Sequence, residues 1–186
     1  MPKQIDEQKI FQTVVDMLIE HGYEGATTKE IAVAAGVNEA TLFRKYASKA
    51  ELFERAINEQ FSNAPLREVE YTGELENDLL EIVKSYLETN ALYGEIIPAL
   101  LAALPRHPEL KGAFSVVWGN IQIMARIIEK YQAEGQLREE SPFACLNILI
   151  GPLMMNQMFL RAELGVAAET ISPEEHVAAF LQGRQA

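Results

Sequence analysis

The sequence predicts an all-α protein, with short helices in its N-terminal part and a larger C-terminal part of longer helices. Three observations favour this fold class. Apolar residues recur at three- and four-residue spacing along most of the chain. Ser or Thr followed three residues later by Glu, or Ser followed by Pro, precedes several of these segments and is a typical helix start. No stretch alternates apolar and polar residues between hairpin turns.

Start and stop signals divide the N-terminal part into short helices. Thr27 and Glu30 form a capping box, and Ser48 with the Glu three residues later forms another. Gly22 and Gly36 supply the stops, because glycine tolerates the positive φ that commonly ends a helix. The helices expected here cover residues 6–21, 27–36, 39–46 and 48–61.

The C-terminal part begins after a segment rich in turn-forming and charged residues. Residues 62–74 contain Pro, Gly and alternating charge, and we expect them to join a domain of residues 1–61 to one of residues 62–186. Ser141-Pro142 and Ser172-Pro173 are starts with proline in the first turn. The helices expected here cover residues 75–92, 95–104, 108–133, 142–164 and 173–181.

Composition excludes several classes of protein. The net charge of −11 argues against a surface that binds polyanions everywhere, so a nucleic-acid site has to be a local basic patch. A single cysteine, Cys145, excludes an internal disulfide framework and a cysteine-rich zinc site, and three scattered His give a metal cage little support. We find no motif for a nucleophile, a phosphate loop, a metal or a cofactor, and therefore predict no enzyme.

One uncharged run is long enough to cross a bilayer. It covers residues 141–160 but contains Asn147, Pro152, Asn156 and Gln157, so we interpret it as a helix buried in protein rather than in lipid. The N-terminus carries acidic residues where a secretory signal needs an apolar core. We therefore expect a cytoplasmic protein without a membrane partner.

Residues 27–53 carry the functional pattern. Two short helices meet at Gly36, and helical spacing puts Leu42 and Tyr46 on the inner face of the second one. Ala40 and Arg44 then point outward, flanked by further small and cationic residues, and residues 41–49 hold three bases and no acid. This is the geometry of a helix-turn-helix whose second helix enters the major groove. The alternative is a bundle corner with a solvated charged face.

The segment resembles the DNA-binding domain of the TetR/AcrR family of bacterial transcriptional regulators. The residues that match the family pattern in register are Thr28, Ile31, Ala32, Ala35, Gly36, Val37, Thr41, Leu42, Tyr46, Ser48, Lys49 and Leu52. The resemblance implies DNA contacts at Thr28, Asn38, Ala40, Thr41, Phe43, Arg44 and Lys49, together with Lys45. Asn38 would cap the recognition helix, Arg44 would contact a guanine edge or a phosphate, and Thr28, Thr41 and Lys49 would hold the backbone. Position 43 is Phe where the family usually has Tyr, and position 40 is Ala where Gly is common.

The resemblance also implies a C-terminal domain that senses a ligand and forms a homodimer. Met, aromatic and amide residues there suit a hydrophobic or aromatic effector, although plain core packing uses the same types. The expected pocket residues are Tyr86, Tyr93, Phe114, Trp118, Gln122, Met154, Asn156 and Met158. The expected dimer residues are Leu146, Ile150, Leu153 and Phe180, the alternative being an interior helix of a monomer.

Together these features predict a dimeric, ligand-released repressor that binds a palindromic operator in double-stranded DNA. The alternative is an all-α ligand-binding or adaptor protein whose N-terminal module has lost sequence-specific DNA binding. The net charge and the missing hydroxyl at Phe43 favour that alternative. The salt dependence of DNA binding would distinguish the two, since an adaptor has no phosphate contacts to weaken.

Overall fold

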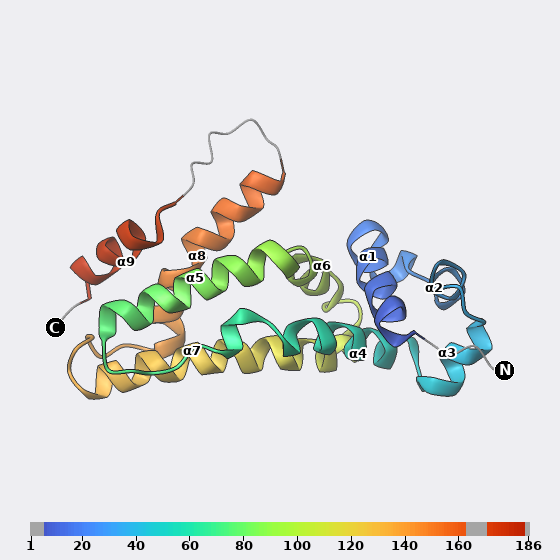
Figure 1. The fold of residues 1–186 in the computed structure, drawn as a ribbon, viewed down its shortest axis with the longest axis horizontal. Helices are drawn as coiled ribbons and strands as arrows, with labels where there is room; N and C mark the ends of the chain where they lie inside the picture. Colours follow the sequence, from blue (N-terminus) through green and yellow to red (C-terminus); the bar gives the residue numbers. More distant parts are fainter. Residues whose placement is uncertain (1–5, 163–170, 185–186) are drawn as a thin grey trace. The chain divides into compact units, whose positions relative to one another are not determined.

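The computed structural model describes residues 6–162 and 171–184, and those residues form nine α-helices, two 3-10 helices and no strand (Figure 1). The all-α prediction is therefore confirmed. The elements are α1 (Glu7–Gly25), α2 (Thr28–Ala35), α3 (Glu39–Lys45), α4 (Lys49–Ser62), η1 (Pro65–Arg67), α5 (Leu75–Tyr93), α6 (Ile96–Ala103), η2 (Pro108–Phe114), α7 (Ser115–Ala133), α8 (Pro142–Arg161) and α9 (Pro173–Gln182).

Most boundaries lie within a few residues of the expected ones, and two differ for a local reason. Gly22 leaves the helical conformation (φ 67°, ψ 174°) as expected, but a last turn follows it and carries α1 on to Gly25. The single helix expected over residues 108–133 is wrong, because its first seven residues form the 3-10 helix η2. In a 3-10 helix residues three apart lie on one side, which buries Leu110 and Ala113 together. The expected end of α8 at residue 164 lies outside the described residues.

The described residues fall into two compact units, which mix segments from both halves of the sequence. Unit 1 contains residues 6–63 together with residues 93–119, so that α6 packs on α1 and η2 packs on α4. Unit 2 contains residues 64–92, 120–162 and 171–184. Residues 93–119 therefore pack with the N-terminal helices, whereas the domain boundary expected from the sequence, at residue 62, assigns them to the C-terminal part.

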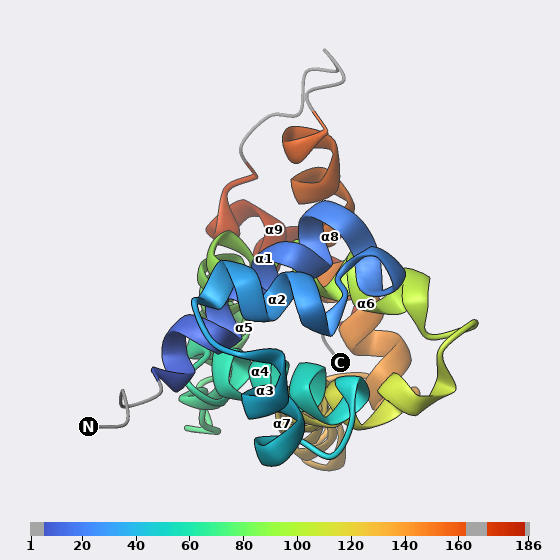
Figure 2. The same ribbon diagram turned by 90° about the vertical axis from the view of Figure 1, so that its right-hand side faces the viewer.

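The core of unit 1 lies between α1 and α4, which pack together through buried apolar side chains. Ile10, Val14 and Leu18 of α1 and Phe53 and Ile57 of α4 are at most 1% exposed. Removing this apolar area from water is the main force that holds such short helices, which would be marginal alone. Helix α2 packs on α1, and α3 packs on α2 (Figure 2).

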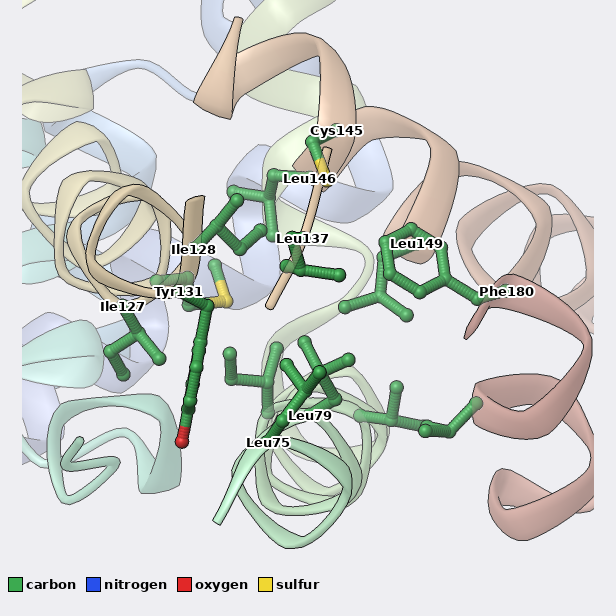
Figure 3. Packing of buried hydrophobic residues seen from close by; sticks show 14 of the residues in the cluster. Leu75, Leu79, Ile127, Ile128, Tyr131, Leu137, Cys145, Leu146, Leu149 and Phe180 are labelled. Carbon is green, nitrogen blue, oxygen red and sulfur yellow. The ribbon is translucent and has the colours of Figure 1, made fainter. Parts of the chain in front are cut away.

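The core of unit 2 gathers apolar side chains from α5, α7, α8 and α9 (Figure 3). One carboxylate lies inside it: Asp78 is 2% exposed, accepts from the backbone N–H of Thr72 at 2.7 Å, and also accepts from the hydroxyls of Thr72 and Tyr131. Burial raises the pKa of Asp78, but these hydrogen bonds outweigh it and leave the pKa below its ordinary value. Through its bond with the Tyr131 hydroxyl, the buried Asp78 carboxylate links the start of α5 to α7.

Candidate nucleic-acid interface

The turn between α2 and α3 is set by a glycine in the left-handed conformation. Gly36 has φ 72° and ψ 32°, and its N–H donates to the carbonyl of Val33 at 3.1 Å. The N–H of Val37 donates to the carbonyl of Ala32 at 2.9 Å. These bonds satisfy carbonyls that a helix end leaves open. At the start of α2, Thr27 and Glu30 form the expected reciprocal capping box.

Helix α3 presents one apolar face inward and the opposite face outward. The Asn38 side chain caps it by accepting from the N–H of Ala40 at 2.9 Å, as predicted. Leu42 and Tyr46 are each 2% exposed, and the Tyr46 hydroxyl donates to Glu7 at 3.2 Å. Burial and the Glu7 carboxylate raise the pKa of Tyr46 to about 12, so this hydroxyl stays a donor.

The outward side of α3 is small, apolar and cationic. Ala40 and Arg44 are exposed, Thr41 is half-buried, and the Phe43 side chain is 55% exposed. A phenylalanine left in water on a seven-residue helix gains nothing for the fold. Arg44 has no hydrogen-bond or ion-pair partner within the described part of the chain. The structure brings these four predicted residues to one accessible surface.

The hydroxyl of Thr28 already has a partner on the next helix. It donates to the Glu39 carboxylate in the first turn of α3 at 2.7 Å. This bond joins the starts of α2 and α3 and occupies the one acid at that end of α3. Thr28 can still offer a backbone N–H, because it is the first residue of α2 and the first N–H groups of a helix have no partner within it.

Two of the predicted basic contacts are engaged inside unit 1. The Lys45 ammonium lies 2.7 Å from the Glu7 carboxylate, and this hydrogen bond lowers the pKa of Glu7. The Lys49 ammonium donates to the carbonyl of Tyr23 and lies 4.2 Å from the centre of the Tyr23 ring. Burial lowers the pKa of Lys49. Both lysines would have to leave these partners to bind phosphate, so the three bases of residues 41–49 do not act as three free charges.

Two exposed residues of α2 were not selected from the sequence. Val33 is 75% exposed and lies one turn after Lys29, which is also exposed, on the same face of the helix. The four-residue spacing between a base and an apolar residue could have identified them. They extend the accessible surface beyond α3.

The expected pocket residues are distributed over both units. Tyr93, Phe114 and Trp118 belong to unit 1, where the Tyr93 ring packs against the Phe61 ring with their centres 5.4 Å apart and their planes tilted by 51°. In unit 2, Tyr86 is half-buried and its hydroxyl accepts from the Asn90 amide at 3.2 Å. Asn156 is also half-buried, and Gln122, Met154 and Met158 are exposed. Their role in ligand binding stays a prediction.

The expected dimer residues mostly face the chain's own core. Leu146, Leu153 and Phe180 are at most 5% exposed and pack in the core of unit 2, and Ile150 packs partly against it. Neighbouring helices of the same chain cover Leu146, Leu153 and Phe180, whereas Ile150 is half-buried, and the role of these residues in a dimer stays a prediction. The apolar side chains that α8 leaves 41–47% exposed are Phe143, Ile148, Met154, Met155, Met158, Phe159 and Leu160.

The expectation that α8 is buried against protein on more than one side stays a prediction, because a single chain covers only part of this helix. Four of its residues are buried, and 22% of its most apolar window lies inside the structure. By length and composition alone α8 could cross a membrane, which is weak support for a membrane span when it concerns a single helix.

Comparison with known proteins gives two matching family descriptions. Residues 10–56 match bacterial regulatory proteins of the tetR family, and residues 69–170 match a tetracyclin repressor-like C-terminal domain. The chain is 37% identical to the HTH-type transcriptional regulator YvkB of Bacillus subtilis over 81 residues, which cover 44% of this chain and 43% of that protein. It is 24% identical to the HTH-type transcriptional repressor AcnR of Corynebacterium efficiens, over 89% of this chain and 86% of that one.

A solved structure shows the same fold. The transcriptional regulator RHA1_ro04179 from Rhodococcus sp. Rha1 aligns with a TM-score of 0.72 at 16% identity, covering 97% of this chain and 98% of that chain. The matches to the first curated relatives span about half the length of those relatives, 43% for the first and 50% for the next three.

Proposed function

The chain belongs to the TetR family of bacterial transcriptional regulators, and from this membership we propose that it is a homodimeric repressor released from a palindromic operator by a small molecule. The family indicates a regulatory rather than a catalytic role and a helix-turn-helix that binds DNA. Such a protein acts in the cytoplasm, where the chromosome is. The division into a DNA-binding domain 1–61 and a sensing and dimerising domain 62–186 is part of the same proposal.

One observation carries the DNA-binding part of the proposal. The Arg44 guanidinium lies on the outward face of α3 without a partner among the described residues, next to the exposed ring of Phe43. Arginine forms bidentate bonds with guanine edges and with phosphates, and a recognition helix presents such a side chain to the major groove. Ala40 keeps the start of the helix small enough for close approach to the bases.

The uncovered side of α8 supports the dimer. Most of its exposed Met, Ile and Phe side chains lie on the side of the helix opposite the core, and so much exposed apolar surface is unusual on a soluble monomer and typical of an interface. A two-fold pairing of α8 would cover it, and a two-fold dimer suits a palindromic operator whose half-sites lie about 34–36 Å apart in successive major grooves. The proposed contacts are Ile148, Met154, Met155 and Met158 in place of the buried residues named from the sequence.

Ligand release requires coupling between the two parts of the chain. A coupling free energy of roughly 1–3 kcal/mol lowers DNA affinity about 5–150-fold, which is enough to empty an operator. The relation to AcnR, which is described as a repressor, favours repression as the output. A hydrophobic or aromatic effector is consistent with the Met, aromatic and amide residues of the middle helices.

In vitro selection from fragmented genomic DNA at physiological salt tests the proposal. We expect one palindromic element to be enriched, and Arg44→Ala to lower affinity for it while the protein stays folded. Arg67→Ala, which removes an exposed arginine of η1, is the matched control and should bind as the wild type does. Failure of a folded dimer to enrich any element would favour the adaptor alternative instead.

A further inference from the structure

Unit 2 contains a buried amide that lacks a hydrogen-bond partner. Asn120 of α7 is 3% exposed, and its Nδ2 is shielded from solvent without an acceptor among the described residues. Native structures pair almost all buried donors, because an unpaired one keeps the cost of losing water and gains nothing in return. The Asn120 side chain therefore indicates a position where an acceptor from outside the chain fits.

The phase of α7 directs this amide into the core of unit 2. Asn120, Met124, Ile127 and Tyr131 follow one another at spacings of four, three and four, which puts them on one face of the helix. Met124, Ile127 and Tyr131 all belong to that core. Asn120 is thus a polar residue at the N-terminal end of an otherwise apolar face of α7.

The pairing of α5 with α7 places Asn120 opposite the C-terminal half of α5. The two helices run in opposite directions (Figure 1), and the Tyr131 hydroxyl donates to Asp78. Thr89 follows Asp78 by about three helical turns, and Asn120 precedes Tyr131 by the same distance. Thr89 on α5 and Asn120 on α7 therefore both lie on the sides of the two helices that face each other, at the same height along the helix pair. Thr89 is 5% exposed, so this level is polar and buried on α5 as well.

Helix α8 adds a cation at the same level. The Arg161 guanidinium donates to the carbonyl of Asn90 and, at 2.7 Å, to its Oδ1, while the Asn90 amide donates to the Tyr86 hydroxyl at 3.2 Å. No carboxylate of the described residues pairs with Arg161. A half-buried cation without an anion and a buried donor without an acceptor thus lie in one layer of unit 2.

We propose that this polar layer, defined as Tyr86, Asn90, Asn120 and Arg161, binds the carboxylate of an effector with an apolar body. Charge-assisted bonds from a guanidinium and an amide favour a carboxylate over a neutral or cationic head group. Ile82, Val83 and Met124 are buried core residues one turn along α5 and α7 from Tyr86 and Asn120, so the apolar body of a bound effector would have to pack among them. The inference rests on the proposed function, since it names the class of small molecule that the C-terminal part senses.

Three probes with one tail and different head groups test the choice of head group: octanoate, octanol and octylamine. At equal ligand concentration, a ligand that binds the native state more tightly raises the melting temperature more, because the stabilisation grows with the logarithm of ligand concentration over Kd. We expect the rise to be largest with octanoate, small with octanol and absent with octylamine. An equal response to all three probes, or no response to octanoate, overturns the proposal.

Variants test the residues of the layer. Asn120→Leu and Arg161→Gln should each weaken octanoate binding about ten-fold or more, the usual effect of losing a hydrogen bond to a charged group. Asn77→Leu makes the same amide-to-leucine change at an exposed position of α5 and should bind octanoate as the wild type does. Unchanged octanoate affinity in Asn120→Leu refutes the assignment.

The unliganded protein gives a second measurement on the same variant. Because the Asn120 donor is unpaired, leucine should leave the melting temperature unchanged or raise it. A clear fall would make Asn120 a structural residue and count against the site.

DNA binding without any probe separates this inference from the proposed function. If the selected element is bound and octanoate is not, the head-group inference fails and the regulator stands. If octanoate binds through the layer and no DNA element is selected, the layer stands and the proposed function fails.

Discussion

Glu7→Gln should strengthen DNA binding, because it releases a lysine from the protein's own surface. In the structure the Glu7 carboxylate holds the Lys45 ammonium at 2.7 Å and accepts from the Tyr46 hydroxyl. The glutamine amide can keep the bond from Tyr46 but removes the charge that holds Lys45. Both partners of the ion pair are more than a third exposed, so its loss costs well under about 1 kcal/mol of stability.

The size of the effect follows from counterion release. One additional phosphate contact steepens the plot of log affinity against log salt by about 0.9 for each copy of the chain, or about 1.8 for a dimer. Lowering the salt from about 0.2 M to about 0.05 M should therefore raise the affinity of the variant about 12-fold more than that of the wild type.

Fluorescence anisotropy with a labelled operator over a salt series measures both slopes. Glu59→Gln makes the same charge change near the end of α4 and controls for the protein's net charge. Equal slopes for Glu7→Gln and Glu59→Gln, or weaker binding by Glu7→Gln, would refute the idea that Glu7 withholds Lys45 from DNA.

Three further predictions concern stability and assembly. Gly36→Ala should lower the free energy of unfolding in urea by about 1–2 kcal/mol, because φ is 72° there although the nearest atom to an added Cβ is 3.7 Å away. Gly151→Ala inside α8 should instead raise the stability of the protein. Equal effects of the two substitutions would contradict the assignment of backbone strain to Gly36. The pKa of Asp78 is lower in the folded state than in the unfolded state, so the ionised carboxylate stabilises the fold above the unfolded-state pKa of about 3.9. This stabilisation is lost as the pH falls through the folded-state pKa. Asp78→Asn should therefore be less stable near neutral pH yet lose less stability than the wild type below about pH 4, as a pH series of unfolding curves will show. Met155→Asp on the exposed face of α8 should shift sedimentation toward monomer, whereas Leu92→Asp, an equally drastic change on α5, should not; an unchanged dimer in Met155→Asp would place the interface elsewhere.

Local sequence determined the helices and their ends. The Thr27–Glu30 capping box, the Asn38 cap and the left-handed Gly36 each depend on residues within a few positions, so their pattern in the sequence specifies the geometry. The single helix expected over 108–133 failed because a 3-10 start and an α-helical start share the same proline signal, and packing against α4 chose between them.

The candidate site was predicted in part for the same reason. Helical spacing alone placed Leu42 inward and Phe43 and Arg44 outward, since a helix repeats every 3.6 residues whatever surrounds it. It could not show that Lys45 meets Glu7, or that Lys49 lies on Tyr23, 26 positions away in the sequence.

The sequence by itself therefore determined the class of fold, the family and the face of α3 that points outward. Tertiary structure alone decided which lysines are engaged, which side of α8 remains uncovered and which segments pack into each unit. Caps, turns and helix faces arise from interactions within one or two turns, whereas ion pairs and burial depend on which distant segments pack together. That is why Arg44 could be selected from the sequence, and the unpaired amide of Asn120 only from the fold.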